Sequence, residues 1–141
     1  MSGADFLDSN VFIYAVDPAD PAKQTIAREL IGQALATQSG VISHQVVQET
    51  LNVLGHKFKV SASRSDRDDL LRNVLAPLWH VFPSVELYAS AMQIHEKQGF
   101  GFYDSLIVAA AVEAKCKRLL TEDLQHGQRI GTLRIENPFR S

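Results

Sequence analysis

The chain has 141 residues, of which 45% are hydrophobic and 21% charged, a composition typical of globular proteins rather than of disordered or fibrous ones. The chain has a single cysteine, Cys116, so it cannot form an internal disulfide bond. Its net charge is −2, and its sequence has no basic tail of the kind that binds nucleic acids. We expect one soluble domain over residues 1–141, cytoplasmic, with neither a secretory signal nor a membrane span.

Short apolar runs alternate with helical periodicity along the first half of the chain. This part of the sequence predicts a strand over 4–8, a helix over 10–16, a loop rich in Asp-Pro, a helix over 21–37, a strand over 41–43 and a helix over 44–58. Pro21 is well placed in the first turn of its helix, and Ser39-Gly40 ends that helix. The alternation is typical of α/β proteins with a mainly parallel sheet.

The second half continues the same alternation. It predicts a helix over 66–76, a strand over 79–82, a helix over 84–98, a helix over 102–117, and strands over 118–121 and 132–138. Ser65 and Asp68 have the spacing of a capping box at the start of the first of these helices. The prediction is therefore five strands and six helices.

Four acidic residues lie where an apolar or neutral residue would pack at lower cost. Asp8 ends the first strand, Glu49 lies in an apolar helix, Asp104 is in the first turn of the most apolar helix, and Asp123 follows a strand. An unpaired buried charge costs several kcal/mol. Each acid alone has an ordinary structural explanation, such as capping a helix or complementing its dipole.

Together the four acids indicate a binding site. Ligands of open α/β sheets gather at the carboxyl ends of the strands, where Asp8 and Asp123 are predicted and where helix N-termini also face. Clustered carboxylates repel one another unless a cation lies between them, and hard cations such as Mg²⁺ or Mn²⁺ prefer oxygen ligands. Such an ion can activate water against a phosphodiester. The net charge does not exclude a polyanionic substrate, because acids gathered around a metal ion leave a small basic surplus elsewhere.

The segments "FLDSNVFIYA", "VVQETLNVL", "FYDSLIVAAA" and "LLTEDLQHG" resemble, in order and spacing, the four acidic motifs of PIN domains, most closely those of stand-alone VapC-type toxins. The resemblance implies a three-layer α/β/α sandwich with a mainly parallel central sheet. It also implies a metal-dependent endoribonuclease of a VapBC-type toxin–antitoxin pair, with Mg²⁺ or Mn²⁺ as cofactor. Its catalytic and metal-binding residues would be Asp8, Glu49, Asp104 and Asp123.

The resemblance also assigns supporting residues and partners. Asn10 would orient Asp8, and Thr121 matches the hydroxyl residue before the last acid. Glu122 stands beside Asp123, so either could be the fourth acid, and the spacing from Thr121 favours Asp123. The implied partners are an RNA substrate, a cognate antitoxin and a second copy of the chain in a homodimer. Candidate RNA contacts are Lys57, Lys59, Arg64 and Arg67.

Two other functions remain open from the sequence. One is a non-catalytic PIN-like interaction module, which the presence of all four acids disfavours. The other is a phosphatase of the haloacid dehalogenase type, which also begins with an aspartate after a strand. That chemistry needs a second aspartate two residues later, where this chain has Asn10.

Overall fold

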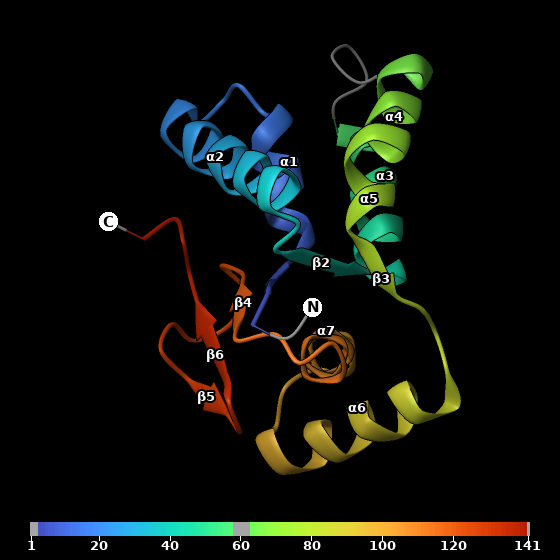
Figure 1. The fold of residues 1–141 in the computed structure, drawn as a ribbon, viewed down its shortest axis with the longest axis vertical. Coiled ribbons are helices and arrows are strands. Elements are labelled where there is room, and N and C mark those ends of the chain that lie inside the picture. Colours follow the sequence, from blue (N-terminus) through green and yellow to red (C-terminus); the bar gives the residue numbers. More distant parts are fainter. Residues whose placement is uncertain (1–2, 58–62, 141) are drawn as a thin grey trace.

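The computed structural model describes residues 3–57 and 63–140, and its strands form one mixed sheet (Figure 1). The strand order is β3-β2-β1-β4-β6-β5, and every neighbouring pair is parallel except β5 and β6. The strands are β1 (Asp5–Leu7), β2 (Gly40–Ser43), β3 (Trp79–Val81), β4 (Arg118–Leu120), β5 (Arg129–Ile130) and β6 (Leu133–Glu136).

Helices cover both faces of this sheet. Figure 1 shows α1 to α5 on one side and α6 and α7 on the other, which makes three layers. The helices are α1 (Ser9–Val16), α2 (Pro21–Thr37), α3 (His44–Lys57), α4 (Arg64–Leu70), a π-helical turn (Leu71–Leu75), α5 (Ala76–Leu78), α6 (Val85–Gln98) and α7 (Phe102–Glu113). The predicted α/β/α sandwich with a mainly parallel sheet is confirmed. Within 3–57 and 63–140, no helix has both the length and the apolar character of a membrane span.

The core lies on both sides of the central strands. Phe6, Val41 and Leu119 belong to neighbouring strands and are fully buried, as expected for strands that helices cover on both faces. On the second side, residues Ser105 to Ala111 of α7 are all buried, and this includes the polar residue Ser105. The small side chains of α7 let the sheet pack against one side of it and α6 against the other. As a result, this helix has no solvent-exposed face along most of its length.

Three local predictions need correction. The capping box uses Ser63 and Asp66 rather than Ser65 and Asp68, with both of its hydrogen bonds present, so the helix begins two residues earlier than expected. The helix that begins at Phe102 ends at Glu113 instead of 117, after which Lys115 adopts a positive φ of 57°. The short strand β5 was not predicted, because two residues are too few for a periodic pattern.

The topology places the predicted acids at one edge of the sheet. Leu7 of β1 is in register with Leu120 of β4, and the next residue, Asp8, donates its backbone N–H to the carbonyl of Leu120 at 3.1 Å. Because these strands are parallel, their carboxyl ends meet at the same edge. Helices α1 and α3 begin directly after β1 and β2, so their N-termini lie at this edge as well.

Candidate active site

Asp8 forms the buried floor of the site. It is the N-cap of α1, and only 5% of it is exposed. Its Oδ1 accepts a hydrogen bond from the backbone N–H of Ser9 at 2.7 Å, and its Oδ2 accepts one from the Thr121 hydroxyl at 2.8 Å. The capping explanation of Asp8 is therefore true, but it accounts for only one of the two oxygens.

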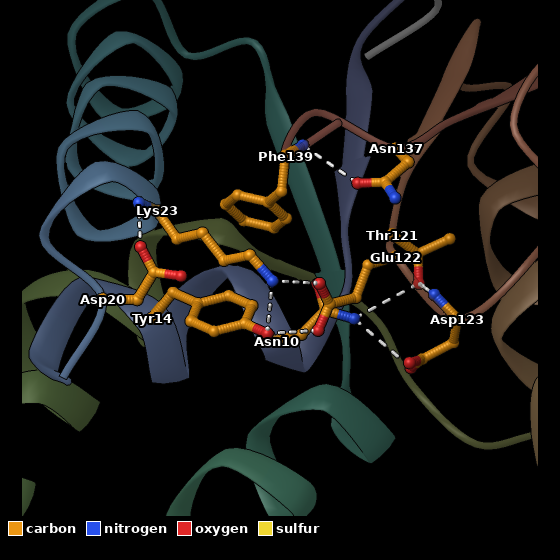
Figure 2. A network of polar contacts seen from close by, with 9 residues as sticks. All are labelled: Asn10, Tyr14, Asp20, Lys23, Thr121, Glu122, Asp123, Asn137 and Phe139. Atoms are coloured by element: carbon orange, nitrogen blue, oxygen red, sulfur yellow. Dashed lines mark hydrogen bonds and ion pairs between the residues drawn. The ribbon is translucent and has the colours of Figure 1, made fainter. Parts of the chain in front are cut away.

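Thr121 connects Asp8 to the other residues of the β4 end, of which Figure 2 draws Asn10 and Asp123. Its buried hydroxyl donates to Asp8 and accepts from the Asn10 side-chain amide at 3.3 Å and from the backbone N–H of Asp123 at 3.1 Å. The same Asn10 amide lies 3.3 Å from Asp123 Oδ2. Asn10 thus contacts Thr121 and Asp123 directly, and it reaches Asp8 only through the threonine hydroxyl.

Replacing Thr121 with valine should lower the free energy of unfolding by about 2 kcal/mol, because the change removes the donor to Asp8, the acceptor of the Asp123 N–H and one of the two acceptors of the Asn10 amide. Urea denaturation of the metal-free protein measures this loss. Thr121→Ser keeps the hydroxyl and is the matched control, with a loss of less than half that size. Equal losses in the two variants would show that the methyl group, and not the hydrogen bonds, carries the role of Thr121.

Glu49 and Asp104 approach from two other helices. Glu49 lies on α3, one turn after Gln45, and Asp104 is in the first turn of α7. The side-chain amide of Gln45 is buried and donates to the carbonyl of Tyr103 at 3.1 Å, which ties the start of α7 to α3. This link fixes the position of Asp104 relative to Glu49.

Burial and the neighbouring carboxylates raise the pKa values of Asp8, Glu49 and Asp104. Burial, followed by the negative charges of Glu49 and Asp123, raises the pKa of Asp8 to about 7. Burial also raises the pKa of Glu49, with contributions from Asp123 and Asp104 and with a hydrogen bond from Gln45 opposing the rise. The pKa of Asp104 is raised by burial and then by Asp123. Each of the four acids thus interacts with at least two others, so they face a common region.

The donor chemistry of this region suits a hydrated divalent cation. The donors are carboxylate oxygens, and the Asn10 amide oxygen, Oδ1, is buried without a hydrogen-bond partner in the described chain. Within residues 3–57 and 63–140, no three His, Cys, Asp or Glu side chains are already grouped closely enough to hold an ion between them. Mg²⁺ suits such a site, because it usually takes one or two carboxylates directly and keeps several waters.

Two residues missed in the sequence occupy the same edge. Tyr14 of α1 donates its hydroxyl to Glu122 at 2.5 Å, and Lys23 of α2 pairs with the other oxygen of Glu122 at 3.2 Å. Asn10 and Tyr14 are four residues apart on one helix, a spacing that places both on the same face. That spacing was the available signal for Tyr14, whereas no local pattern marks Lys23.

The candidate RNA contacts lie along α3 and α4. Arg64 is exposed and Arg67 is half-buried, and with Leu51, Asp68 and Leu71 they line a groove of about 360 Å³. The Arg67 side chain reaches Gly55, which lies six residues beyond Glu49, or ~9 Å along the axis of α3. Lys57 is the last residue of α3, and Lys59 falls outside the described residues.

Comparison with solved structures shows the same fold in bacterial proteins. The structure of Mycobacterium tuberculosis VapC20, a sarcin–ricin loop-cleaving toxin, is 16% identical, with a TM-score of 0.61 over 85% of this chain and 92% of that one. A toxin–antitoxin complex from Klebsiella pneumoniae is 15% identical, with a TM-score of 0.64 over 98% and 100%. VapBC2 from Rickettsia felis, bound to a promoter DNA fragment, is 22% identical, with a TM-score of 0.58 over 95% and 98%.

The sequence itself was compared with known families and proteins. No curated protein matches it. The family model for the PIN domain, in contrast, matches residues 6–129, which include all four acidic segments. Since this match spans most of the chain, the protein belongs to the PIN domain family.

Proposed function

We propose that the protein is a metal-dependent endoribonuclease that hydrolyses RNA phosphodiesters. The observation that carries the proposal is a set of four carboxylates from separate elements that lie around the buried Asp8, close enough for their charges to raise the pKa values of Asp8, Glu49 and Asp104. Such a set is unfavourable in itself, and a divalent cation compensates its charge. When bound, Mg²⁺ or Mn²⁺ supplies a Lewis acid and a water of lowered pKa.

The acidic residues would have different roles according to how deeply each is buried. Asp8 is buried and held by Ser9 and Thr121, so it would supply a fixed oxygen at the floor. Asp123 is exposed and Asp104 is partly exposed, so these carboxylates face the side from which a substrate approaches. No covalent nucleophile is needed, and Cys116 is unsuited to that role because burial raises its thiol pKa to about 12.

The groove between α3 and α4 supports an RNA substrate. Arg67 has a buried Nε without a hydrogen-bond partner in the described chain, and Arg64 is exposed beside it. Guanidinium groups bind phosphates with several donors at once, which suits a nucleic-acid backbone leaving the site along α3. We assign Arg64 and Arg67 this role, and include Lys57 and Lys59 in the same proposal from their place in the sequence.

Within the PIN family, we propose the role of a cytoplasmic VapBC-type toxin paired with an antitoxin. The likeness to VapC20 and to two toxin–antitoxin complexes supports this narrower proposal. We also propose a homodimer, formed through the outward face of α6. There Val85, Tyr88 and Met92 are exposed and help to line a shallow groove of about 520 Å³, an apolar surface of the kind that marks protein interfaces.

Metal removal tests the function directly. Purified protein with Mn²⁺ is expected to cleave single-stranded RNA internally, and excess EDTA should stop cleavage, because the acids alone lack a means of activating water. Restoring Mn²⁺ should restore the rate. Gel analysis of end-labelled RNA, together with thermal unfolding with and without Mn²⁺, makes the measurement. Full cleavage in EDTA would contradict the proposed mechanism, and a protein that neither cleaves nor gains stability from Mn²⁺ would be the non-catalytic module instead.

A further inference from the structure

Two adjacent acids follow β4, and the structure treats them differently (Figure 2). The Asp123 carboxylate lies on the side of Asn10 and Thr121, whereas the Glu122 carboxylate is held by Tyr14 and Lys23. The side chain of Glu122 is 25% exposed, and both of its oxygens have a partner. One face of α1 therefore contacts both acids, Asp123 through Asn10 and Glu122 through Tyr14.

Tyr14, Lys23 and Glu122 each contact the other two. Tyr14 donates its hydroxyl to Oε1 of Glu122, while Lys23 Nζ lies 3.2 Å from Oε2 and 3.2 Å from the Tyr14 hydroxyl oxygen. The ammonium also lies 4.7 Å from the centre of the Tyr14 ring, which attracts it through a cation–π contact. Lys23 thus has its charge matched by one carboxylate and its position set by an aromatic ring.

Two further elements hold this group in place. The Phe139 ring contacts Tyr14 edge-on at 4.9 Å between ring centres, so the chain end packs against α1. The backbone N–H of Lys23 donates to Asp20, the N-cap residue of α2, which sets the start of that helix. Figure 2 shows Tyr14 and Lys23 converging on Glu122 from α1 and α2, with the Phe139 ring beside them.

We propose that Lys23 and Tyr14 are positioning residues that keep Glu122 out of the carboxylate site, so that Asp123 alone serves as its acid from this segment. The inference rests on the proposed metal-dependent function. Without Lys23, a second carboxylate with no matching positive charge would stand one residue from Asp123 and compete for the same cation. Charge neutralisation of Glu122 is thus the specific role of Lys23, as opposed to contact with RNA.

The proposal predicts opposite effects on binding and on cleavage. Lys23→Met removes a positive charge and leaves the negative charge of Glu122 unmatched, so Mn²⁺ should bind about threefold more tightly to the variant. Cleavage at saturating Mn²⁺ should nevertheless fall about tenfold, because the competing carboxylate displaces Asp123 from its place. Mn²⁺ binding is measured on the protein without RNA, by electron paramagnetic resonance of the free ion.

A second substitution separates this role from others. Adding Glu122→Gln to Lys23→Met removes the competing charge while keeping an acceptor for Tyr14, so both Mn²⁺ affinity and cleavage should return to within about twofold of wild type. Glu122→Gln alone leaves the Lys23 charge unmatched, so it should weaken Mn²⁺ binding about threefold while cleavage at saturating Mn²⁺ stays within about twofold of wild type. Arg28→Met is the matched control, because Arg28 lies on the same helix and bonds to the Ala15 carbonyl instead of an acid. It should leave Mn²⁺ affinity unchanged.

The outcomes distinguish this inference from the proposed function. If wild type binds Mn²⁺ and cleaves RNA but Glu122→Gln fails to relieve the Lys23→Met defect, or Lys23→Met has no defect, the inference is wrong and the function stands. Loss of cleavage in Glu122→Gln alone would make Glu122 a ligand and would also overturn the inference. A wild-type protein without Mn²⁺ binding or cleavage would overturn both.

Discussion

Replacing Asp104 with asparagine is expected to reduce RNA cleavage on the order of 10³-fold while leaving the fold intact. Asp104 is partly exposed at the start of α7, and its charge is opposed by burial and by Asp123, so removing that charge does not weaken the fold. The loss should fall on the chemical step, because asparagine has the same shape but neither the charge nor both acceptor oxygens. Single-turnover cleavage with saturating Mn²⁺ measures the rate, and thermal unfolding checks the fold.

The matched control comes from the other end of the same helix. Glu113 is the last residue of α7 and is exposed, so Glu113→Gln makes the same chemical change away from the site. It should cleave RNA at the wild-type rate. Undiminished cleavage by Asp104→Asn would contradict the assignment of Asp104 to the active site.

The metal-free protein is expected to lose stability as pH rises from about 4 to about 7. The folded state raises the pKa of Asp8 from 3.8 to about 7, so within this window the folded protein holds a proton that the unfolded chain releases. A group with a raised folded pKa stabilises the protein fully below its unfolded pKa, and this contribution is lost as pH reaches the folded pKa. The rise corresponds to on the order of 4 kcal/mol, and urea denaturation in EDTA across the window measures it.

Asp8→Asn should flatten this pH profile and stabilise the metal-free protein at pH 7.5. Asparagine has one carbonyl oxygen, so it can accept from Ser9 or from Thr121 but not from both, which offsets part of the gain by about 1 kcal/mol. Mn²⁺ should stabilise wild type at pH 7.5 and should not stabilise the variant. Asp69→Asn, an exposed change on α4, should keep the wild-type slope. Parallel profiles for wild type and Asp8→Asn would contradict the prediction.

The fold could be predicted from sequence because its elements leave local signals. Pro21 begins α2 and Gln98 ends α6 as expected, and the apolar runs around Phe6, Val41 and Leu119 are strands covered on both faces. The boundaries that failed depend on weaker signals. Ser63 and Ser65 are each followed by an aspartate three residues later, so the sequence alone does not distinguish the two possible capping boxes.

The four acids of the candidate site could be identified because carboxylates are conspicuous in apolar surroundings, but their supporting residues could not. Gln45 acts through a contact with Tyr103, which is distant in sequence, so no short pattern marks it, and the helical spacing of Tyr14 from Asn10 does not reveal its partner Glu122. The same is true of Lys23, whose partner is about a hundred residues away. Such residues become visible only when the topology has brought the segments together.

The burial of α7 on all sides has a consequence for how this protein can diversify. A helix whose residues Ser105 to Ala111 are enclosed tolerates neither larger side chains nor a shift, so the wall that presents Asp104 is rigid. The arginine-lined groove beside α4 is open and bears no such constraint. We therefore expect selectivity for different RNAs to evolve along that groove while the hydrolytic chemistry is inherited unchanged.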